Sequence, residues 1–173
     1  MTGKGEKMSG WILKSGERVV DRYNSHLHEG VARLLPDALA RIESGGGGFF
    51  VEEVDFGRPI GETTCVATAA GDEVIYAKRP KRLGHTRFVL NRTPEPCSSL
   101  VIILKAGGDG EYVLITAFIG HRPQPEPWDR KNFLQQPDPQ KAERLAREFW
   151  SSHALVWGSE EVFPGTETVR CPL

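Results

Sequence analysis

Long hydrophobic runs are missing from this sequence of 173 residues, although 39% of its residues are hydrophobic. No stretch approaches the roughly 20 apolar residues that a membrane span requires. Near the N-terminus only Trp11, Ile12 and Leu13 form an apolar run, and this is too short for the core of a signal peptide. We therefore expect no membrane association and a cytoplasmic protein.

Cysteine is scarce: Cys65, Cys97 and Cys171 are an odd number and have no C-x-x-C spacing. This pattern argues against a disulfide framework and against a zinc ribbon, and it indicates reduced thiols. The nearest approach to a metal-ligand pattern is His26-x-His28, which is not convincing by itself. We predict neither a metal nor another cofactor.

A large excess of charge of one sign is also missing, because 22 Lys and Arg face 23 Asp and Glu, for a formal net charge of -1. A polyanionic partner would therefore have to be bound by a local patch. One stretch provides such a patch. The segment YAKRPKRLGHTRFVLNR, from Tyr76 to Arg92, holds six basic residues, one histidine and no acid.

The spacing of apolar residues predicts an α+β fold, with a flexible arm over residues 1–25 and a single domain over residues 26–173. Residues 27–43 have helical spacing, and Pro36 should break or kink this segment into two short helices. After the glycines at 45–48, strand patterns follow at residues 63–68, 73–77, 85–91, 99–105 and 112–119. Glycine-rich turns join neighbouring strands, so we predict an antiparallel meander of four or five strands, with residues 99–105 in its centre.

The end of the chain adds one amphipathic helix to this sheet. Five prolines between residues 120 and 139 predict an irregular loop. Asp138 and Pro139 then provide an N-cap and a first helical residue, and apolar residues recur at helical spacing up to Trp150. Residues 154–157, ALVW, are expected to add a last short strand.

The basic segment places two functional groups on one side of a strand. Alternation over residues 85–91 directs Thr86 and Phe88 to the core and directs His85 and Arg87 to the other face. Residues two apart on a strand are about 6–7 Å apart, which spans a phosphodiester and the 2′-hydroxyl beside it. The same alternation over residues 112–119 puts Thr116 and Phe118 on one side, together with Tyr112 and Leu114. If both strands belong to one sheet, all these groups share a concave surface.

Such a set suits cleavage of RNA without a metal. The reaction needs a base for the 2′-hydroxyl proton, cations for the charge on the phosphorane, and an acid for the leaving 5′-oxygen. Histidine serves as base or acid near neutral pH. An aromatic ring that stacks an unpaired base contributes about 1–3 kcal/mol.

Three features follow one another over residues 31–120: helices followed by a meander, a basic segment leading into His85-Thr86-Arg87, and the strand Ile115-Thr116-Ala117-Phe118. Together they resemble the barnase/EndoU/colicin/RelE-type (BECR) ribonuclease fold. The resemblance implies His85 as catalytic base or acid, Lys78 or Arg87 as the phosphate electrophile, and Thr116 as an orienting hydroxyl. Expected substrate contacts are Arg79, Lys81, Arg82, Arg92, Phe118 and Trp128. The expected partners are RNA and an inhibitor or antitoxin protein. The sequence departs from the pattern at Phe118, where tyrosine is common, and a second histidine is offered only by His121 or His153.

Two other functions are open at this point. The basic segment at 78–92 also suits a module that binds RNA or an acidic protein without catalysis, and the prolines with Trp128 suit a protein-interaction surface. Several residues have structural alternatives as well. Trp128 is either a stacking platform or the anchor of its loop, and Arg92 either binds substrate or pairs with Glu95.

Overall fold

The chain divides into two compact units, each assembled from two separate segments. The computed structural model describes residues 10–23, 27–45 and 47–172. Unit 1 comprises Met1–Glu62 and Pro96–Arg122, and unit 2 comprises Thr63–Glu95 and Pro123–Leu173. The chain passes from unit 1 to unit 2 within β4 (Gly61–Thr63) and returns within β8 (Glu95–Cys97), and these two strands pair as a two-stranded sheet. The fold is α+β, as predicted, but residues 26–173 are not gathered into the one compact body that was expected.

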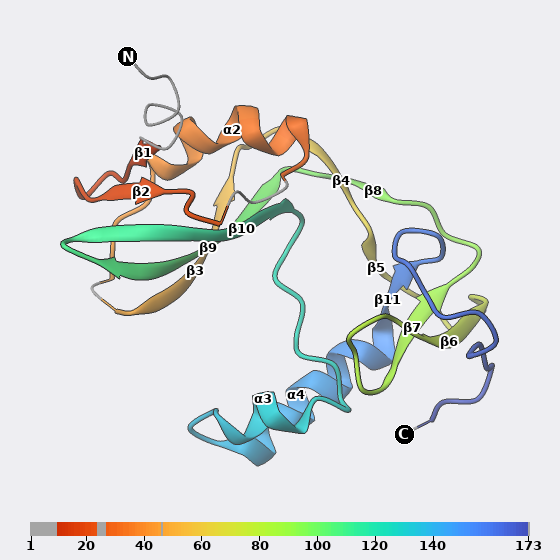
Figure 1. Ribbon diagram of the computed structural model, residues 1–173. Coiled ribbons are helices and arrows are strands. Elements are labelled where there is room, and N and C mark those ends of the chain that lie inside the picture. Colours follow the sequence, from red (N-terminus) through yellow and green to blue (C-terminus); the bar gives the residue numbers. More distant parts are fainter. Residues whose placement is uncertain (1–9, 24–26, 46, 173) are drawn as a thin grey trace. The chain divides into compact units, whose positions relative to one another are not determined.

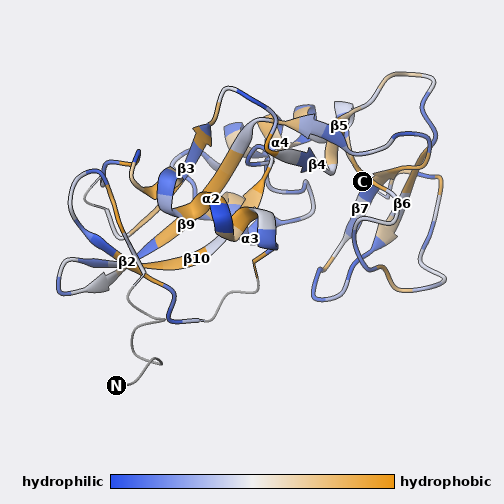
Figure 2. Cartoon of the chain, turned by 90° about the horizontal axis from the view of Figure 1, so that it is seen from above, coloured by the Kyte–Doolittle hydropathy of each residue, from blue (hydrophilic) through white to orange (hydrophobic). Residues whose placement is uncertain are grey.

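Unit 1 is a five-stranded sheet with a helix on one face (Figure 1). The strand order is β1 (Trp11–Ile12), β2 (Arg18–Val20), β10 (Glu111–Ile119), β9 (Ser99–Gly108) and β3 (Phe49–Asp55). Only β2 and β10 pair in parallel. Strand β9 is hydrophobic along most of its length (Figure 2), and it has the interior position that its apolar pattern predicts, between β10 and β3; the central strand of the sheet, however, is β10.

Helix α2 (Glu29–Leu39) continues through Pro36. Its apolar side packs against alternate residues of β9 and β10 in the core of unit 1, among them Leu100, Ile102 and Leu114. Pro36 is exposed, so the carbonyl group that it leaves without a donor, that of Ala32, faces solvent as well. Packing of one apolar face therefore outweighs the cost of an interior proline, and the predicted break at Pro36 is wrong.

The first two strands lie in the segment predicted to be flexible. Trp11 pairs with Val19 between β1 and β2, and Val19 in turn pairs with Tyr112 of β10. Val19 is fully buried. The predicted arm over residues 1–25 is therefore ordered at residues 11–20, while residues 1–9 and 24–25 lie outside the described residues.

Unit 2 is built on a four-stranded sheet of order β5 (Cys65–Ala67), β11 (His153–Val156), β7 (His85–Val89) and β6 (Val74–Lys78). Strands β11 and β7 are parallel, and the other pairs are antiparallel. Helices α3 (Arg130–Leu134) and α4 (Pro139–Ser152) precede β11. Helix α4 begins as predicted, because the carboxylate of Asp138 accepts a hydrogen bond from the Lys141 N–H at 3.1 Å. Helix α3 was not predicted within its proline-rich loop.

The predicted strands do not form one meander. Strands β6 and β7 belong to the sheet of unit 2, whereas β9 and β10 belong to that of unit 1. Strands β5 and β6 are joined by a turn at residues 69–72, yet β11 and β7 lie between them in the sheet. The late strand β11 inserts beside β5, and pairing of segments so distant in sequence leaves no trace in local hydrophobic patterns.

Candidate functional site

Strand β7 presents the predicted imidazole and guanidinium on the predicted side. Thr86 is fully buried, whereas His85 and Arg87 are half-buried. In the ladder between β6 and β7, Lys78 pairs with His85 and Tyr76 pairs with Arg87. Paired residues project to the same face of a sheet. Four functional side chains therefore share one face in unit 2.

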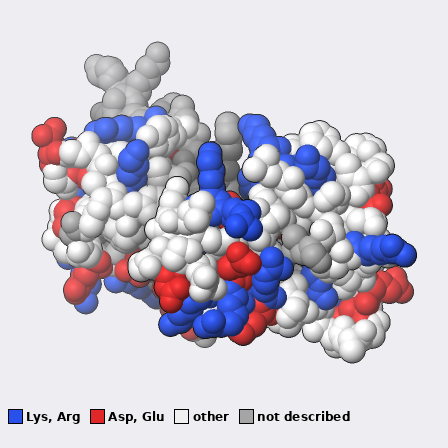
Figure 3. Space-filling view, turned by 90° about the horizontal axis from the view of Figure 1, so that it is seen from below, with Lys and Arg blue, Asp and Glu red and all other residues white. Residues whose placement is uncertain are grey.

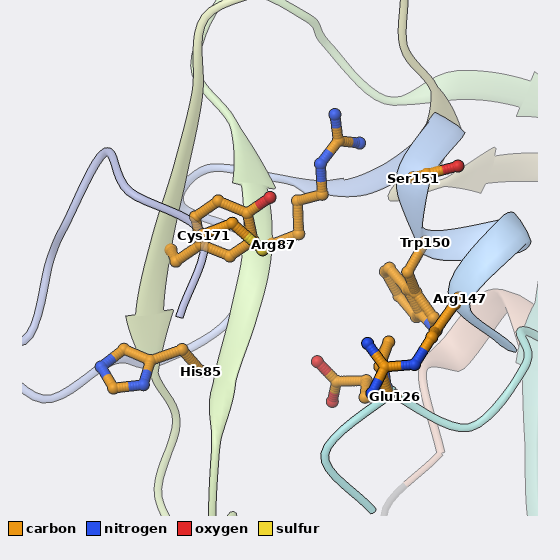
Figure 4. Close-up of a pocket in the computed structure, with 9 residues that line it drawn as sticks. His85, Arg87, Glu126, Arg147, Trp150, Ser151 and Cys171 are labelled. Carbon is orange, nitrogen blue, oxygen red and sulfur yellow. The ribbon is translucent and has the colours of Figure 1, made fainter. Parts of the chain in front are cut away.

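A cavity of about 290 Å³ opens on this face. The charged and aromatic side chains that line it are Tyr76, His85, Arg87, Glu126, Arg147 and Trp150. Figure 4 shows Arg87 extending from β7 toward α4, while the imidazole of His85 points away from the Arg87 guanidinium. His85 and Arg87 thus line the same cavity, but their functional groups point apart.

Arg87 is held in place by the fold of unit 2. Its Nη1 donates one hydrogen bond to Thr68 Oγ1 and another to the carbonyl oxygen of His153, both at 2.9 Å. These bonds connect β7 with the end of β5 and the start of β11. Burial and the neighbouring Cys171 raise the pKa of the Tyr76 phenol, and the Arg87 guanidinium opposes that rise. Arg87 is therefore preorganised and also contributes to the structure.

Arg79 and Arg92, which were predicted to contact substrate, are ion-paired within unit 2. Arg79 Nη2 lies 2.8 Å from Glu126 Oε2, and the two side chains are only 15% and 10% exposed. Arg92 Nη2 lies 3.0 Å from a carboxylate oxygen of Asp72 rather than near Glu95. Because both charges are already neutralised, these arginines are poor candidates for contacts with phosphate.

Besides Arg87, three cations of the same segment have no such partner among the described residues. Lys78, Lys81 and Arg82 form no ion pair with any residue that the structure describes. They belong to residues 78–84, here called the basic turn, in which the Arg82 N–H donates to the Arg79 carbonyl oxygen at 3.2 Å. Lys81 has a positive φ of 63°, and Leu83 is 85% exposed. The basic turn therefore carries uncompensated positive charge on an exposed loop.

Trp128 lies against the basic turn. A Cβ atom at Gly84 would be 2.3 Å from Trp128 Cγ, so the side chain fits only because residue 84 is glycine. The indole Nε1 is buried and has no hydrogen-bond partner among the described residues. This packing corresponds to the loop-anchor alternative: Trp128 joins the proline-rich loop to the basic turn.

Thr116 and Phe118 lie in unit 1, so the prediction that they share one sheet with His85 and Arg87 is wrong. A β-bulge between Leu114 and Thr116 also changes the alternation along β10. Before the bulge, Leu114 faces the core with Tyr112. After it Ala117 faces the core, and Thr116 and Phe118 project from the face away from α2.

A histidine accompanies these two residues in unit 1. Phe118 pairs with Val101, and Val101 pairs with Glu53, so that Glu53 lies on the same face as Phe118. The Nδ1 of His121 lies 2.8 Å from Glu53 Oε1, and the imidazole is 70% exposed. The carboxylate favours the tautomer with hydrogen on Nδ1, which leaves the lone pair of Nε2 directed outward.

Glu126, Arg147 and Trp150 of the cavity were not predicted as site residues. They come from the proline-rich loop and from α4, and only packing against β6 and β7 brings them together. The helical spacing of Trp150 indicated a core residue rather than a site residue. Trp150 is 6% exposed, and its Nε1 donates a hydrogen bond to the carbonyl oxygen of Gln124 at 2.8 Å. Arg147 looks like an ordinary solvated residue of an amphipathic helix.

On the face drawn in Figure 3, Lys and Arg are interspersed with Asp and Glu. Among the described residues, no group of three or more His, Cys, Asp or Glu is arranged to hold a metal ion. No helix in the described part of the chain is long and apolar enough to cross a membrane.

Comparison with known proteins finds a structure of similar fold but indicates no function. No family model and no curated protein matches the chain. A crystal structure at 2.35 Å of a conserved hypothetical protein from Toxoplasma gondii ME49 is similar, with a TM-score of 0.51 and 12% sequence identity. The match covers 76% of this chain and 86% of that one. At this identity the similarity concerns the fold alone.

Proposed function

We propose that unit 2 binds single-stranded RNA through the basic turn. The observation that carries the proposal is the grouping of Lys78, Lys81 and Arg82 without acidic partners among the described residues. Like charges held together on a loop repel one another, and a polyanion relieves this repulsion. The net charge of -1 means that such binding rests on the local patch.

The neighbouring cavity favours a nucleic acid over an acidic protein. His85 faces Lys78 across the β6–β7 ladder and lines the cavity, so the basic turn and the cavity adjoin one another. Tyr76 and Trp150 give the cavity aromatic walls. A cationic track beside aromatic rings is the usual arrangement for binding an RNA strand without reading its sequence.

Fluorescence anisotropy with a labelled single-stranded RNA tests the proposal. Each phosphate contact to single-stranded nucleic acid contributes about 0.7 to the slope of log K against log salt, so replacing Lys78, Lys81 and Arg82 by alanine should lower that slope by about 2. The matched control replaces Lys131, Lys141 and Arg144, three cations on α3 and α4 of the same unit. Equal affinities and slopes for the two triple variants would refute binding at the basic turn.

Cleavage of that RNA without a metal is a second candidate function. Two histidines offer proton transfer: His85, beside Lys78 in unit 2, and His121, which Glu53 orients in unit 1. In either case the base takes the 2′-hydroxyl proton, O2′ forms a bond to phosphorus, and the bond from phosphorus to O5′ breaks. The 5′-oxygen takes a proton from water. A cleaving protein would suit an acidic inhibitor or antitoxin that covers the basic turn.

Incubation with mixed RNA in EDTA, followed by analysis of the ends, separates binding from cleavage. A 2′,3′-cyclic phosphate is expected from the wild type. His85→Ala and His121→Ala then identify the proton-transfer group, and anisotropy measured in parallel shows whether each variant still binds RNA. If the wild type binds RNA but yields no cyclic phosphate, the protein is a binding module. His153 serves as a control histidine, because it stacks on Phe149 with ring centroids 4.0 Å apart.

A further inference from the structure

The cavity of unit 2 retains net positive charge despite its carboxylate. Arg87, Arg147 and Glu126 are its permanently charged lining residues. Glu126 is already paired, because its Oε2 lies 2.8 Å from Nη2 of Arg79, which does not line the cavity. Arg87 forms no ion pair with the described residues, and Arg147 pairs with Glu143 only through its Nε, so its terminal nitrogens remain available to an anionic ligand.

Both guanidinium groups are positioned before any ligand arrives. Arg87 is fixed by the two hydrogen bonds from its Nη1 to Thr68 and to the His153 carbonyl. Arg147 uses its Nε for the bond to Glu143 Oε2 at 3.1 Å, and this bond orients the terminal nitrogens. Figure 4 shows the Arg147 guanidinium beside the Glu126 carboxylate. A guanidinium has five N–H donors, so each group keeps capacity for a phosphate oxygen.

The walls of the cavity suit a flat ring. Tyr76 is close enough to Arg87 and Cys171 for both to influence the pKa of its phenol, and the indole of Trp150 is fixed by its hydrogen bond to the Gln124 carbonyl oxygen. The volume of about 290 Å³ lies just below the range for small-molecule sites, which begins near 300 Å³. There is room for one small aromatic ligand that carries an anionic group.

We infer that this cavity binds one nucleotide, a phosphate monoester that carries an aromatic base. The phosphate lies on Arg147 and Arg87, and the base lies against Tyr76. Glu126 accepts a hydrogen bond from an N–H group of the base. The same chemistry is offered by a free nucleotide and by the phosphorylated end of an RNA strand. The inference does not depend on RNA binding by the basic turn.

Calorimetric titration with adenosine and uridine monophosphates, adenosine and inorganic phosphate tests the assignment on the full chain. A monophosphate should bind at least tenfold more tightly than adenosine. The variant Arg147→Gln should weaken monophosphate binding about tenfold or more, because it removes a charge-assisted hydrogen bond. Arg144→Gln is the matched control, since Arg144 is exposed on the same helix and does not line the cavity. Both arginines are exposed, so neither variant should unfold the protein.

Two results would overturn the assignment: equal affinity of the two variants for the monophosphates, or equal affinity of the wild type for adenosine and its monophosphate. Failure of both monophosphates and of phosphate-ended RNA to bind up to about 1 mM would also overturn it. RNA oligomers with and without a 5′- or 3′-terminal phosphate distinguish the sources. A preference for the phosphorylated end that Arg147→Gln abolishes assigns the site to an RNA end, and binding of monophosphates alone assigns it to free nucleotides. The basic-turn triple variant should bind monophosphates normally in either case.

Discussion

Substitution of Gly84 by alanine should destabilise unit 2 through a clash with Trp128. The new Cβ would lie 2.3 Å from Trp128 Cγ, 2.6 Å from Cδ1 and 2.7 Å from Cβ. Carbon atoms in contact prefer about 3.5–4.0 Å, so the indole must move by roughly 1 Å or more. The clashing atoms are at the root of the side chain, so the loop backbone has to move with it. Overpacking of this kind costs about 1–3 kcal/mol in the free energy of unfolding.

Urea unfolding monitored by tryptophan fluorescence measures this loss, since three of the four tryptophans, Trp128, Trp150 and Trp157, are in unit 2. The clash predicts a lower midpoint with an unchanged slope. A double-mutant cycle with Trp128→Ala isolates the contact: in the Trp128→Ala background, Gly84→Ala should cost little, which gives a coupling energy of about 1 kcal/mol or more.

Gly71→Ala is the matched control for backbone effects. Gly71 lies in the turn between β5 and β6, and nothing lies within 4 Å of the Cβ that alanine would add. This variant should change stability by about 0.5 kcal/mol or less. If Gly84→Ala is as stable as Gly71→Ala, or if its cost is the same with and without the indole, Trp128 does not anchor the basic turn.

Three further predictions concern charges and thiols. Arg79→Met leaves Glu126 buried without its cation and should lower the free energy of unfolding by about 3–5 kcal/mol. The double variant Arg79→Met/Glu126→Met should recover part of this loss. Equal urea midpoints for the single and double variants would contradict the buried pair. The hydrogen bond from the Ala69 N–H, followed by contacts with Arg92 and Asn91, lowers the pKa of Asp72 below its ordinary 3.8. Because the folded pKa is the lower one, the stabilisation is present above pH 3.8 and is lost as the pH falls through the folded value. Asp72→Asn should therefore flatten the acid limb of stability against pH, and an unchanged limb would contradict this. Burial, and then Glu126, raise the pKa of the Cys65 thiol to about 11, so iodoacetamide at pH 8 should alkylate the exposed Cys171 and spare Cys65 and the buried Cys97. Mass spectrometry that finds Cys65 modified as fast as Cys171 would refute the assigned burial.

Local sequence chemistry determined most of the elements. Alternation correctly assigned the buried Thr86 and Phe88 and the accessible sides of His85 and Arg87, because the period of a strand is a property of its backbone. The start of α4 followed from Asp138 and Pro139 for a similar reason: capping involves atoms only three residues apart. The basic turn was visible as a run of cations without acids.

Tertiary structure alone decided which strands share a sheet and which cations form ion pairs. Strand β11, near the end of the chain, inserts between β5 and β7, and the pairing of distant segments depends on how the chain returns. The bulge near Ile115 turned the second half of β10, which strict alternation along the sequence does not anticipate. Arg79 resembles Lys81 in the sequence, yet it meets Glu126 from a segment 47 residues away and is neutralised. Ionic partners and cavity walls are chosen by proximity in space, which the order of residues along the chain does not reveal.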